Sequence, residues 1–324
     1  MKIKSFFKGL FKDTLITAWV MFKIMIPVSI VVKILQMTGA IEYIGIALSP
    51  IMRLVGLPGE MGLVWGTGMI TNLFGGIMAY LNLAPSFHLT VAQTTILALM
   101  MLVAHTFPIE LQVARKAGVK LITMFIIRFG FAFLMGLVLN LIYNGFDVLQ
   151  EPSVITWKKQ VSVDPSLQGW AVGELKNYLT IFLFIFSLLL LVKILKVTGV
   201  IHLITKGLSP LLKLMGIGAE VTTIAIIGLT LGVVYGGVLI INESKNKDIS
   251  KRDIFYCLAL MGLCHSVIED TILMMALGGH YTGVLIFRVL ASFIIIWAIV
   301  KYTKHLSDSS FAKYFLARNE KVDK

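Results

Sequence analysis

Charged residues are scarce in this chain. Asp, Glu, Lys and Arg make up only 14% of its 324 residues, whereas a soluble domain averages roughly a quarter. Hydrophobic residues make up 57%, and the mean hydropathy is +0.89 over the whole length, so the apolar excess is not confined to one anchor. This composition excludes an ordinary soluble globule. It predicts an all-α polytopic membrane protein whose first partner is the lipid bilayer.

Acidic residues are the scarcer charged class, with 17 Asp and Glu against 29 Lys and Arg, which gives a net charge of +12. In a soluble chain this excess would indicate nucleic-acid binding, but in a membrane protein it is expected in the cytoplasmic loops. We therefore predict no nucleic-acid partner.

Cysteine is nearly absent, and the two present, Cys257 and Cys264, lie seven residues apart in one apolar segment. That spacing places them two helical turns apart, too far for a disulfide bond. His265 follows them, but no second pair of ligands accompanies the three, so neither a metal site nor a cofactor is predicted. The motifs GxSxG, GxxxxGKS/T and HExxH are also absent, and we expect the protein not to be an enzyme.

The N-terminal sequence MKIKSFFKGLFKD combines lysines with apolar residues at helical spacing. It resembles the start of a signal peptide, but the apolar stretch that follows exceeds 20 residues, contains Lys23 and lacks a small-residue cleavage site. We predict a retained membrane helix, preceded by an amphipathic segment over 1–13 that lies on the anionic inner leaflet.

The chain contains one unit written twice. Residues 31–60 align with 191–220, and 14 of these 30 positions are identical. The identical positions include polar residues, glycines and a proline, which a shared hydrophobic composition does not explain. We predict two membrane repeats, over 14–143 and 177–302.

Each repeat contains five apolar segments that are long enough, or nearly so, to cross the roughly 30 Å of hydrocarbon in a bilayer. They cover 14–37, 41–57, 61–83, 92–113 and 120–143 in the first repeat, and 177–197, 201–216, 221–242, 254–276 and 282–302 in the second. An odd number of crossings would place the second repeat upside down relative to the first. The second segment of each repeat is short and interrupted by Ser-Pro, so a re-entrant or interfacial helix is the alternative there.

Loop charges favour the inverted arrangement. The loop over 84–91 is uncharged, whereas its counterpart over 243–253 holds four Lys or Arg. In the next pair of loops, 115–120 is basic and 278–280 is not. Because basic loops face the cytoplasm, we predict a multi-pass protein of the cell membrane with both termini cytoplasmic. This topology makes the linker over 144–176 extracytoplasmic and the basic tail over 303–324 cytoplasmic.

Ionisable residues recur at matching positions inside the apolar segments. HTFPIE, starting at His105, matches HSVIED, starting at His265, and each repeat carries an arginine in its last segment. An ionisable group in lipid costs roughly 2.5–3.5 kcal/mol on insertion scales and is usually retained by a partner or a function. We predict that these groups exchange a proton or hold a cation during transport. The set comprises His105, Glu110, Arg128, His265, Glu269, Asp270 and Arg288. In the alternative interpretation, the histidines donate to a neighbouring helix and the acids pair with the arginines.

The segment GTGMITNLFGG, from Gly66 to Gly76, is a poor continuous helix because it contains four glycines, two threonines and an asparagine. Its counterpart is GLTLGVVYGG, from Gly228 to Gly237. Such interruptions at corresponding positions of inverted repeats are typical of broken helices whose free backbone groups bind substrate. The predicted substrate-binding residues are Thr71, Asn72, Gly75, Gly76, Tyr235, Gly236 and Gly237. The alternative is close helix packing through small residues.

The pattern SPIMRLVGLPGEMGLVWGTGMITNLFGG and its repeat SPLLKLMGIGAEVTTIAIIGLTLGVVYGG resemble the nucleoside-recognition or Gate domain. This domain occurs in spore maturation membrane proteins and in the pore regions of concentrative nucleoside and ferrous iron transporters. The resemblance covers 30–140 and 190–300, and implies a two-repeat, all-helical, transporter-like core with the Gly-rich stretches as recognition elements. The chain departs from the iron transporters in having no N-terminal GTPase domain and no cysteine in either Gly-rich stretch. It departs from the nucleoside transporters in having fewer helices, so nucleoside specificity does not carry over.

Together these patterns predict a secondary transporter or permease of a small polar solute, coupled to protons or to a cation such as sodium. Nucleoside-like compounds lead the list of solutes by resemblance only. The competing class is a non-transporting membrane factor that acts with a partner protein, as the spore-maturation resemblance allows. A membrane partner or a second copy of the chain, in a homo-oligomer, is a separate expectation. A weaker alternative is an intramembrane enzyme that uses the same histidines and acids.

Overall fold

The computed structural model describes residues 3–156, 166–244 and 249–317, with further gaps between 201 and 216. These residues form helices joined by short turns, with two isolated β-bridges and no strand among them. The helices are α1 (Ile3–Met37), α2 (Ala40–Leu54), α3 (Met61–Ile70), α4 (Leu73–Leu83), η1 (Ala84–Ser86), α5 (Val91–Val103), α6 (Phe107–Lys116), α7 (Leu121–Gly145), α8 (Leu167–Val197), α10 (Ala219–Leu231), α11 (Val233–Glu243), α12 (Lys251–Leu263), α13 (Glu269–Ala276), η2 (Thr282–Phe287), α14 (Arg288–Thr303) and α15 (Asp308–Phe315).

Five helical stretches in the described part of the chain are long and apolar enough to cross a membrane. They are Lys8–Met37, Val91–Lys116, Leu121–Gly145, Leu167–Leu195 and Thr282–Thr303. The helices α3, α4, α10 and α11 contain only 10 to 13 residues each, so each extends over roughly half of the hydrocarbon thickness. The protein is therefore an all-helical membrane protein in which long helices alternate with pairs of short ones.

Each pair of short helices arises from a break inside one of the predicted apolar segments. α3 and α4 separate at Thr71, and α10 and α11 separate at Gly232. The other two breaks, between α5 and α6 and between α12 and α13, contain Thr106 and Ser266. Their φ angles of 53° and 46° lie in the left-handed region, which few non-glycine residues adopt. The predicted interruption of Gly66–Gly76 is present, and further interruptions occur at the two histidine motifs.

Left-handed glycine turns recur at equivalent positions of the two repeats. Gly39 and Gly199 have φ of 71° and 77°, and Gly118 and Gly278 have φ of 90° and 98°. Glycine adopts these angles without the steric penalty of a Cβ atom. The turns therefore recur where the sequence repeats, while the relative orientation of the two repeats stays a prediction.

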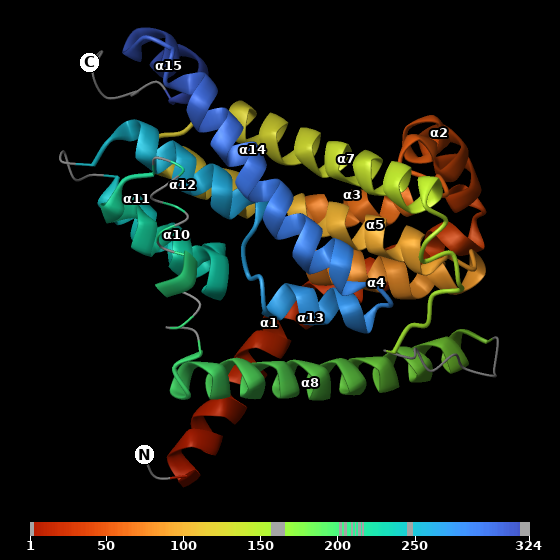
Figure 1. Ribbon diagram of the computed structural model, residues 1–324. Coiled ribbons are helices and arrows are strands. Elements are labelled where there is room, and N and C mark those ends of the chain that lie inside the picture. Colours follow the sequence, from red (N-terminus) through yellow and green to blue (C-terminus); the bar gives the residue numbers. More distant parts are fainter. Residues whose placement is uncertain are drawn as a thin grey trace, which may run out of the picture.

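The helices α5 and α12 are buried along most of their length, and the longer helices α7 and α14 pack against them (Figure 1). α5 packs against α7, and α12 packs against both α7 and α14. The short helices α3 and α4 contact α5, whereas α10 and α11 contact α12. α8 crosses α1 along one edge of the molecule (Figure 1). The two histidine motifs thus follow two helices, α5 and α12, that both pack on α7.

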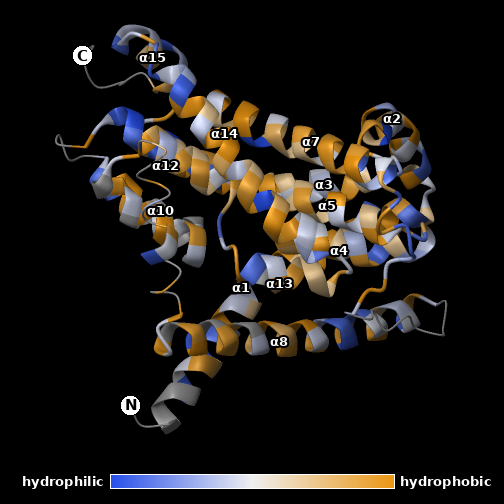
Figure 2. Cartoon of the chain, in the orientation of Figure 1, coloured by the Kyte–Doolittle hydropathy of each residue, from blue (hydrophilic) through white to orange (hydrophobic). Residues whose placement is uncertain are grey.

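Hydrophobic residues predominate along the long helices, as the colouring of Figure 2 shows, and many of their large apolar side chains are exposed. Examples are Trp19 on α1, Ile126 on α7, Leu183 on α8 and Ile294 on α14, each more than half exposed. In contrast, α5 is buried along nearly its whole length. A bilayer accommodates such an apolar exterior, whereas water would not.

Helices lie near both ends of the described chain. α1 extends without a break from Ile3 to Met37, so residues 3–13 are continuous with the first membrane helix. The side chains of residues 1–7 lie outside the described set. In the tail, Phe311 and Phe315 of α15 pack against Phe255 of α12 with ring centroids 5.6 and 4.9 Å apart.

Candidate functional site

Two histidines from the two repeats meet in the centre of the protein. Nε2 of His105 lies 3.2 Å from Nε2 of His265, and the ring centroids are 4.9 Å apart. The residues are only 4% and 3% exposed. Their contact joins equivalent positions of the two repeats. The structure therefore brings the two predicted histidine motifs into one site.

Each histidine ring is oriented by the helix that precedes it. Nδ1 of His105 lies 2.8 Å from the carbonyl oxygen of Met101, and Nδ1 of His265 lies 2.7 Å from that of Met261. A carbonyl oxygen only accepts hydrogen bonds, so this arrangement assigns the ring hydrogen to Nδ1 in both neutral rings and leaves Nε2 as an acceptor. The acceptors belong to each histidine's own helix, and not to a neighbouring helix as the alternative interpretation expected.

Glu110, in the first turns of α6, connects the histidines to an arginine. Its Oε1 lies 3.6 Å from Nε2 of His105 and 3.5 Å from Nε2 of His265. Its Oε2 forms an ion pair with Nη1 of Arg128. The Glu110 side chain is 11% exposed and that of Arg128 is 1% exposed. One carboxylate thus bridges the histidine pair and a buried cation.

The two arginines cap the broken ends of α5 and α12. Arg128 donates from Nε to the carbonyl of Val103 (3.0 Å) and from Nη2 to that of His105 (3.1 Å). Arg288 donates in the same way to Leu263 (3.3 Å) and His265 (2.9 Å). The last carbonyls of a helix lack partners within the helix, and a cation there also interacts favourably with the helix dipole. The arginines therefore position the histidine motifs.

The two acidic residues of the motifs differ in their contacts. Asp270 is 9% exposed, and it forms no ion pair with Arg288 comparable to that of Glu110 with Arg128. A carboxylate oxygen of Asp270 and a ring nitrogen of each histidine all lie within 4.8 Å of one another. Asp270 therefore borders the histidine pair, while the neighbouring Glu269, half-buried, begins α13.

The Gly-rich helices are attached to the histidine motifs through the main chain. The amide of Thr106 donates to the carbonyl of Gly68 on α3 (3.0 Å), and the amide of Val267 donates to that of Leu229 on α10 (2.9 Å). Both bonds connect a Gly-rich helix to the break that follows a histidine. The predicted recognition elements and the predicted ionisable cluster are thus adjacent.

The polar side chains at the α3–α4 break form hydrogen bonds with main-chain groups. Asn72 Oδ1 accepts a hydrogen bond from the Gly75 amide (2.9 Å) and so caps α4, and the Thr71 hydroxyl donates to the carbonyl of Thr67 (2.6 Å). Gly76 lies against Gly68, because a Cβ added to Gly76 would be 3.1 Å from Cα of Gly68. These contacts agree with the packing alternative at this position.

The second Gly-rich stretch has a similar close approach. An added Cβ at Gly236 would lie 2.8 Å from Cα of Gly228. Gly237 is buried, and the side chain of Tyr235 lies outside the described set. Both repeats therefore pack their two short helices against each other through a pair of glycines.

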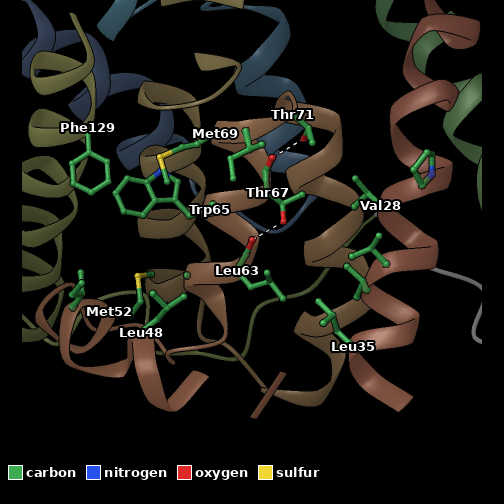
Figure 3. Close-up of a pocket in the computed structure, with 17 residues that line it drawn as sticks. Val28, Leu35, Leu48, Met52, Leu63, Trp65, Thr67, Met69, Thr71 and Phe129 are labelled. Carbon is green, nitrogen blue, oxygen red and sulfur yellow. Dashed lines mark hydrogen bonds between the residues drawn. The ribbon is translucent and has the colours of Figure 1, made fainter. Parts of the chain in front are cut away.

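A cavity of about 590 Å³ lies between α1, α2, α3 and α7 (Figure 3). Its lining is almost entirely apolar, and its threonine hydroxyls are engaged, since Thr67 donates to Leu63 (2.7 Å) and Thr71 to Thr67. The indole N–H of Trp65 donates to the carbonyl of Met100 (3.1 Å). Of this lining, only Thr71 is among the binding residues predicted from the sequence, because the other residues have the composition of ordinary membrane helices.

A comparison with known protein families finds a match over most of the first repeat. Residues 18–132 match the Gate family model, described as nucleoside recognition. This match confirms the resemblance over that region, which contains the first Gly-rich stretch, His105, Glu110 and Arg128. It covers a little over a third of the chain.

One curated relative matches over nearly the full length. It is the uncharacterized membrane protein YvoD of Bacillus subtilis strain 168, which is 29% identical over 300 residues, covering 92% of this chain and 95% of that protein. No solved structure matches the chain. The comparisons therefore support a membrane protein with a Gate-like region.

Proposed function

We propose that the protein is a secondary transporter or permease of a small polar solute, and not an enzyme. The observation that carries this proposal is the buried contact between His105 and His265 at the ends of two broken helix pairs. Broken helices that meet between two repeats are the arrangement through which many secondary transporters bind solutes and ions inside the membrane. A purely structural pair of helices would not need buried ionisable groups at both breaks.

The proposal includes the predicted topology. The two repeats would be inverted, with both termini on the cytoplasmic side of the cell membrane and each broken pair counted as one crossing. The two Gly-rich elements and the two histidine motifs would then approach the centre from opposite sides. Alternating access requires such a central site with two routes to it.

The solute would be recognised mainly by main-chain groups at the Gly-rich breaks. The Thr71 hydroxyl and the Asn72 side-chain oxygen already bond to the backbone. The proposed binding elements are Thr71, Asn72, Gly75 and Gly76 in the first repeat, with Tyr235, Gly236 and Gly237 in the second. Nucleoside-like compounds lead the list because the matching family model is described as nucleoside recognition.

Glu110 is the residue we assign to ion coupling. Its Oε1 faces both imidazoles while its Oε2 is held by Arg128, so a proton or cation arriving at this point changes the charge balance of both repeats at once. Asp270 is the second acid beside the pair. Occupation of the site would thereby be coupled to the packing of α5 against α12.

Transport by the purified protein in liposomes tests the proposal. Uptake of labelled nucleosides, nucleobases and other small polar solutes is measured under an imposed proton or sodium gradient. We expect gradient-dependent accumulation of at least one solute, and loss of the gradient dependence in Glu110→Gln. The control is Glu42→Gln, because Glu42 is an exposed glutamate on α2.

Two results would contradict the proposal. A folded protein that moves no solute under either gradient would favour the membrane factor that acts with a partner. A chemically altered solute would favour an intramembrane enzyme.

A further inference from the structure

Three hydrogen-bond acceptors converge between the two repeats. The Nε2 atoms of His105 and His265 both present lone pairs, because each Nδ1 bonds a main-chain carbonyl. Oε1 of Glu110 is the third acceptor, 3.6 and 3.5 Å from the two nitrogens. Buried acceptors that face one another without a donor or cation between them are unfavourable. The arrangement therefore calls for a positively charged occupant.

The separations match the edges of a tetrahedral metal site. With metal–ligand bonds of about 2.0–2.1 Å, two ligand atoms lie about 3.4 Å apart. The three measured separations are 3.2, 3.5 and 3.6 Å. Asp270 supplies a fourth group, since its carboxylate and both imidazoles have ligand atoms within 4.8 Å of one another. Each of the two carboxylates thus lies near both imidazoles.

The groups behind these ligands already orient them. A histidine that binds a metal usually donates its other ring N–H to a carbonyl or carboxylate, which fixes the tautomer. The carbonyls of Met101 and Met261 occupy these positions. Arg128 pairs with Oε2 of Glu110 and leaves Oε1 directed toward the histidines. Little rearrangement would be needed when an ion arrives.

We propose that His105, His265 and Glu110, with Asp270 as the fourth group, bind one divalent transition-metal ion of the Zn²⁺ class. Imidazole nitrogen suits Zn²⁺ and its neighbours in the first transition series, whereas Mg²⁺, Ca²⁺ and Na⁺ depend on oxygen ligands.

The charges around the site favour the same class of ion. Arg128 and Arg288 balance the two carboxylates, so charge attraction alone would hold an ion weakly. The bonds from the imidazoles therefore select the ion. The sequence-based prediction of no metal site considered only Cys257, Cys264 and His265, and the second histidine comes from the other repeat.

The metal site rests on geometry alone, whereas a role of the bound ion in transport rests on the proposed function. Binding is therefore measured on the full-length protein in detergent, without solute or gradient. Lack of transport with intact binding would remove the proposed function alone, and transport without binding would remove this inference alone.

The first measurement uses the unaltered protein. After treatment with a chelator, the protein is loaded with Zn²⁺ or Co²⁺, desalted and analysed for metal content, with Mg²⁺ as the comparison ion. We expect about one Zn²⁺ or Co²⁺ per chain, as for a single four-ligand site, and no retained Mg²⁺. Co²⁺ in such a site gives the visible absorption of tetrahedral cobalt. X-ray absorption at the zinc edge should show scattering from two imidazoles.

The variants His265→Gln and Glu110→Gln locate the ion, with His280→Gln as the matched control. His280 is a half-buried histidine of the second repeat that bonds Thr282 (2.8 Å) and lies outside the cluster. We expect at least about a 10- to 100-fold loss of Zn²⁺ affinity in the first two variants, since even outer-shell changes reach that range. The His280→Gln protein should bind as the unaltered protein does.

Three outcomes would overturn the inference: retention of less than about a tenth of an ion per chain where a single site predicts one, equal binding in all three variants, or a zinc spectrum without imidazole. The spectrum needs no variant, so the inference stays testable if His265→Gln or Glu110→Gln fails to fold.

Discussion

Arg128 and Arg288 perform the same task in the two repeats, but their acidic partners differ. Each arginine donates to two carbonyls at the end of a broken helix of its own repeat, with spacing that repeats to the residue, and Arg288 also donates to the carbonyl of Leu102 (3.3 Å). Of the two arginines, only Arg128 has a carboxylate in direct contact among the described residues, from Glu110. Nη1 of Arg288 is buried without a hydrogen-bond partner among the described residues. At the scale of single residues, the charge in the centre is therefore distributed asymmetrically.

This asymmetry predicts a large effect of Arg128→Gln on stability. The substitution leaves the Glu110 carboxylate buried without its cation, which we expect to lower the free energy of unfolding by about 3–5 kcal/mol. Unfolding of the protein in detergent, followed by circular dichroism, measures the change. The double variant Glu110→Gln/Arg128→Gln should recover part of the loss, because it removes both charges.

The control is the exposed pair of Lys193 with Asp13, whose charged atoms are 3.4 Å apart. Asp13→Asn should cost no more than about 1 kcal/mol. A loss in Arg128→Gln no larger than that of Asp13→Asn would contradict a structural role for the buried pair.

The short helices of each repeat depend on close backbone packing. α3 approaches α4 at Gly68 and Gly76, and α10 approaches α11 at Gly228 and Gly236. The methionines Met101 and Met261 pack over these glycines, and their carbonyls hold the histidine rings. At the scale of elements, helix packing and the histidine site are therefore connected through the same two residues.

Gly76→Ala tests this connection. The added Cβ would lie 2.7 Å from Cε of Met101 and 3.1 Å from Cα of Gly68, so neighbouring atoms must move. We expect a destabilisation of about 1–3 kcal/mol from overpacking, measured as a lower melting temperature in detergent. Gly66→Ala is the matched control, since an added Cβ there meets no atom within 4 Å. It should be neutral or slightly stabilising because alanine favours helix. Equal effects of the two substitutions would contradict close packing at Gly76.

The ionisable cluster could be predicted from the sequence, and the alternative interpretation also anticipated the pairing of Glu110 with Arg128, but the other contacts of the cluster could not be predicted. Polar residues inside apolar runs stand out, and the alignment of the two repeats pairs His105 with His265. The difference between the contacts of Glu110 and those of its counterpart Asp270 follows from where the helices α6 and α13 begin. Pro108 lies in the first turn of α6, a favoured place for proline, whereas Ile268 replaces it and α13 begins later, at Glu269. The acids of the two motifs therefore occupy different positions on their helices.

The main-chain carbonyls that accept hydrogen bonds from the histidines could not be predicted from the sequence either. Every residue carries a carbonyl, so no sequence signal marks those of Met101 and Met261 as the partners of the histidines. The breaks within the helices depend on tertiary contacts in the same way. The amide of Thr106, for example, bonds Gly68 of another helix.

At the scale of the whole molecule, the apolar perimeter formed by the long helices surrounds a polar centre supplied by both repeats. The tail is fixed to this core, since Arg252 donates to the carbonyls of Thr303 (2.6 Å) and Leu306 (2.8 Å) and pairs with Asp308 (2.9 Å). The central site can open to each side of the membrane in turn only if the two repeats have opposite orientations in the membrane.

Cysteine labelling in intact cells tests this orientation. Ser86 and Ser250 are exposed and lie in the equivalent loops of the two repeats, whose charges differ. Because basic loops face the cytoplasm, we expect Ser86→Cys to react with an impermeant thiol reagent from outside and Ser250→Cys to react only after permeabilisation. Tyr281→Cys, at an exposed position after the uncharged second-repeat loop, should also react from outside. The native Cys257 and Cys264 are buried and should give little background. If Ser86→Cys and Ser250→Cys react from the same side, the repeats are parallel, and the His105–His265 contact loses its place as a site reached alternately from the two sides.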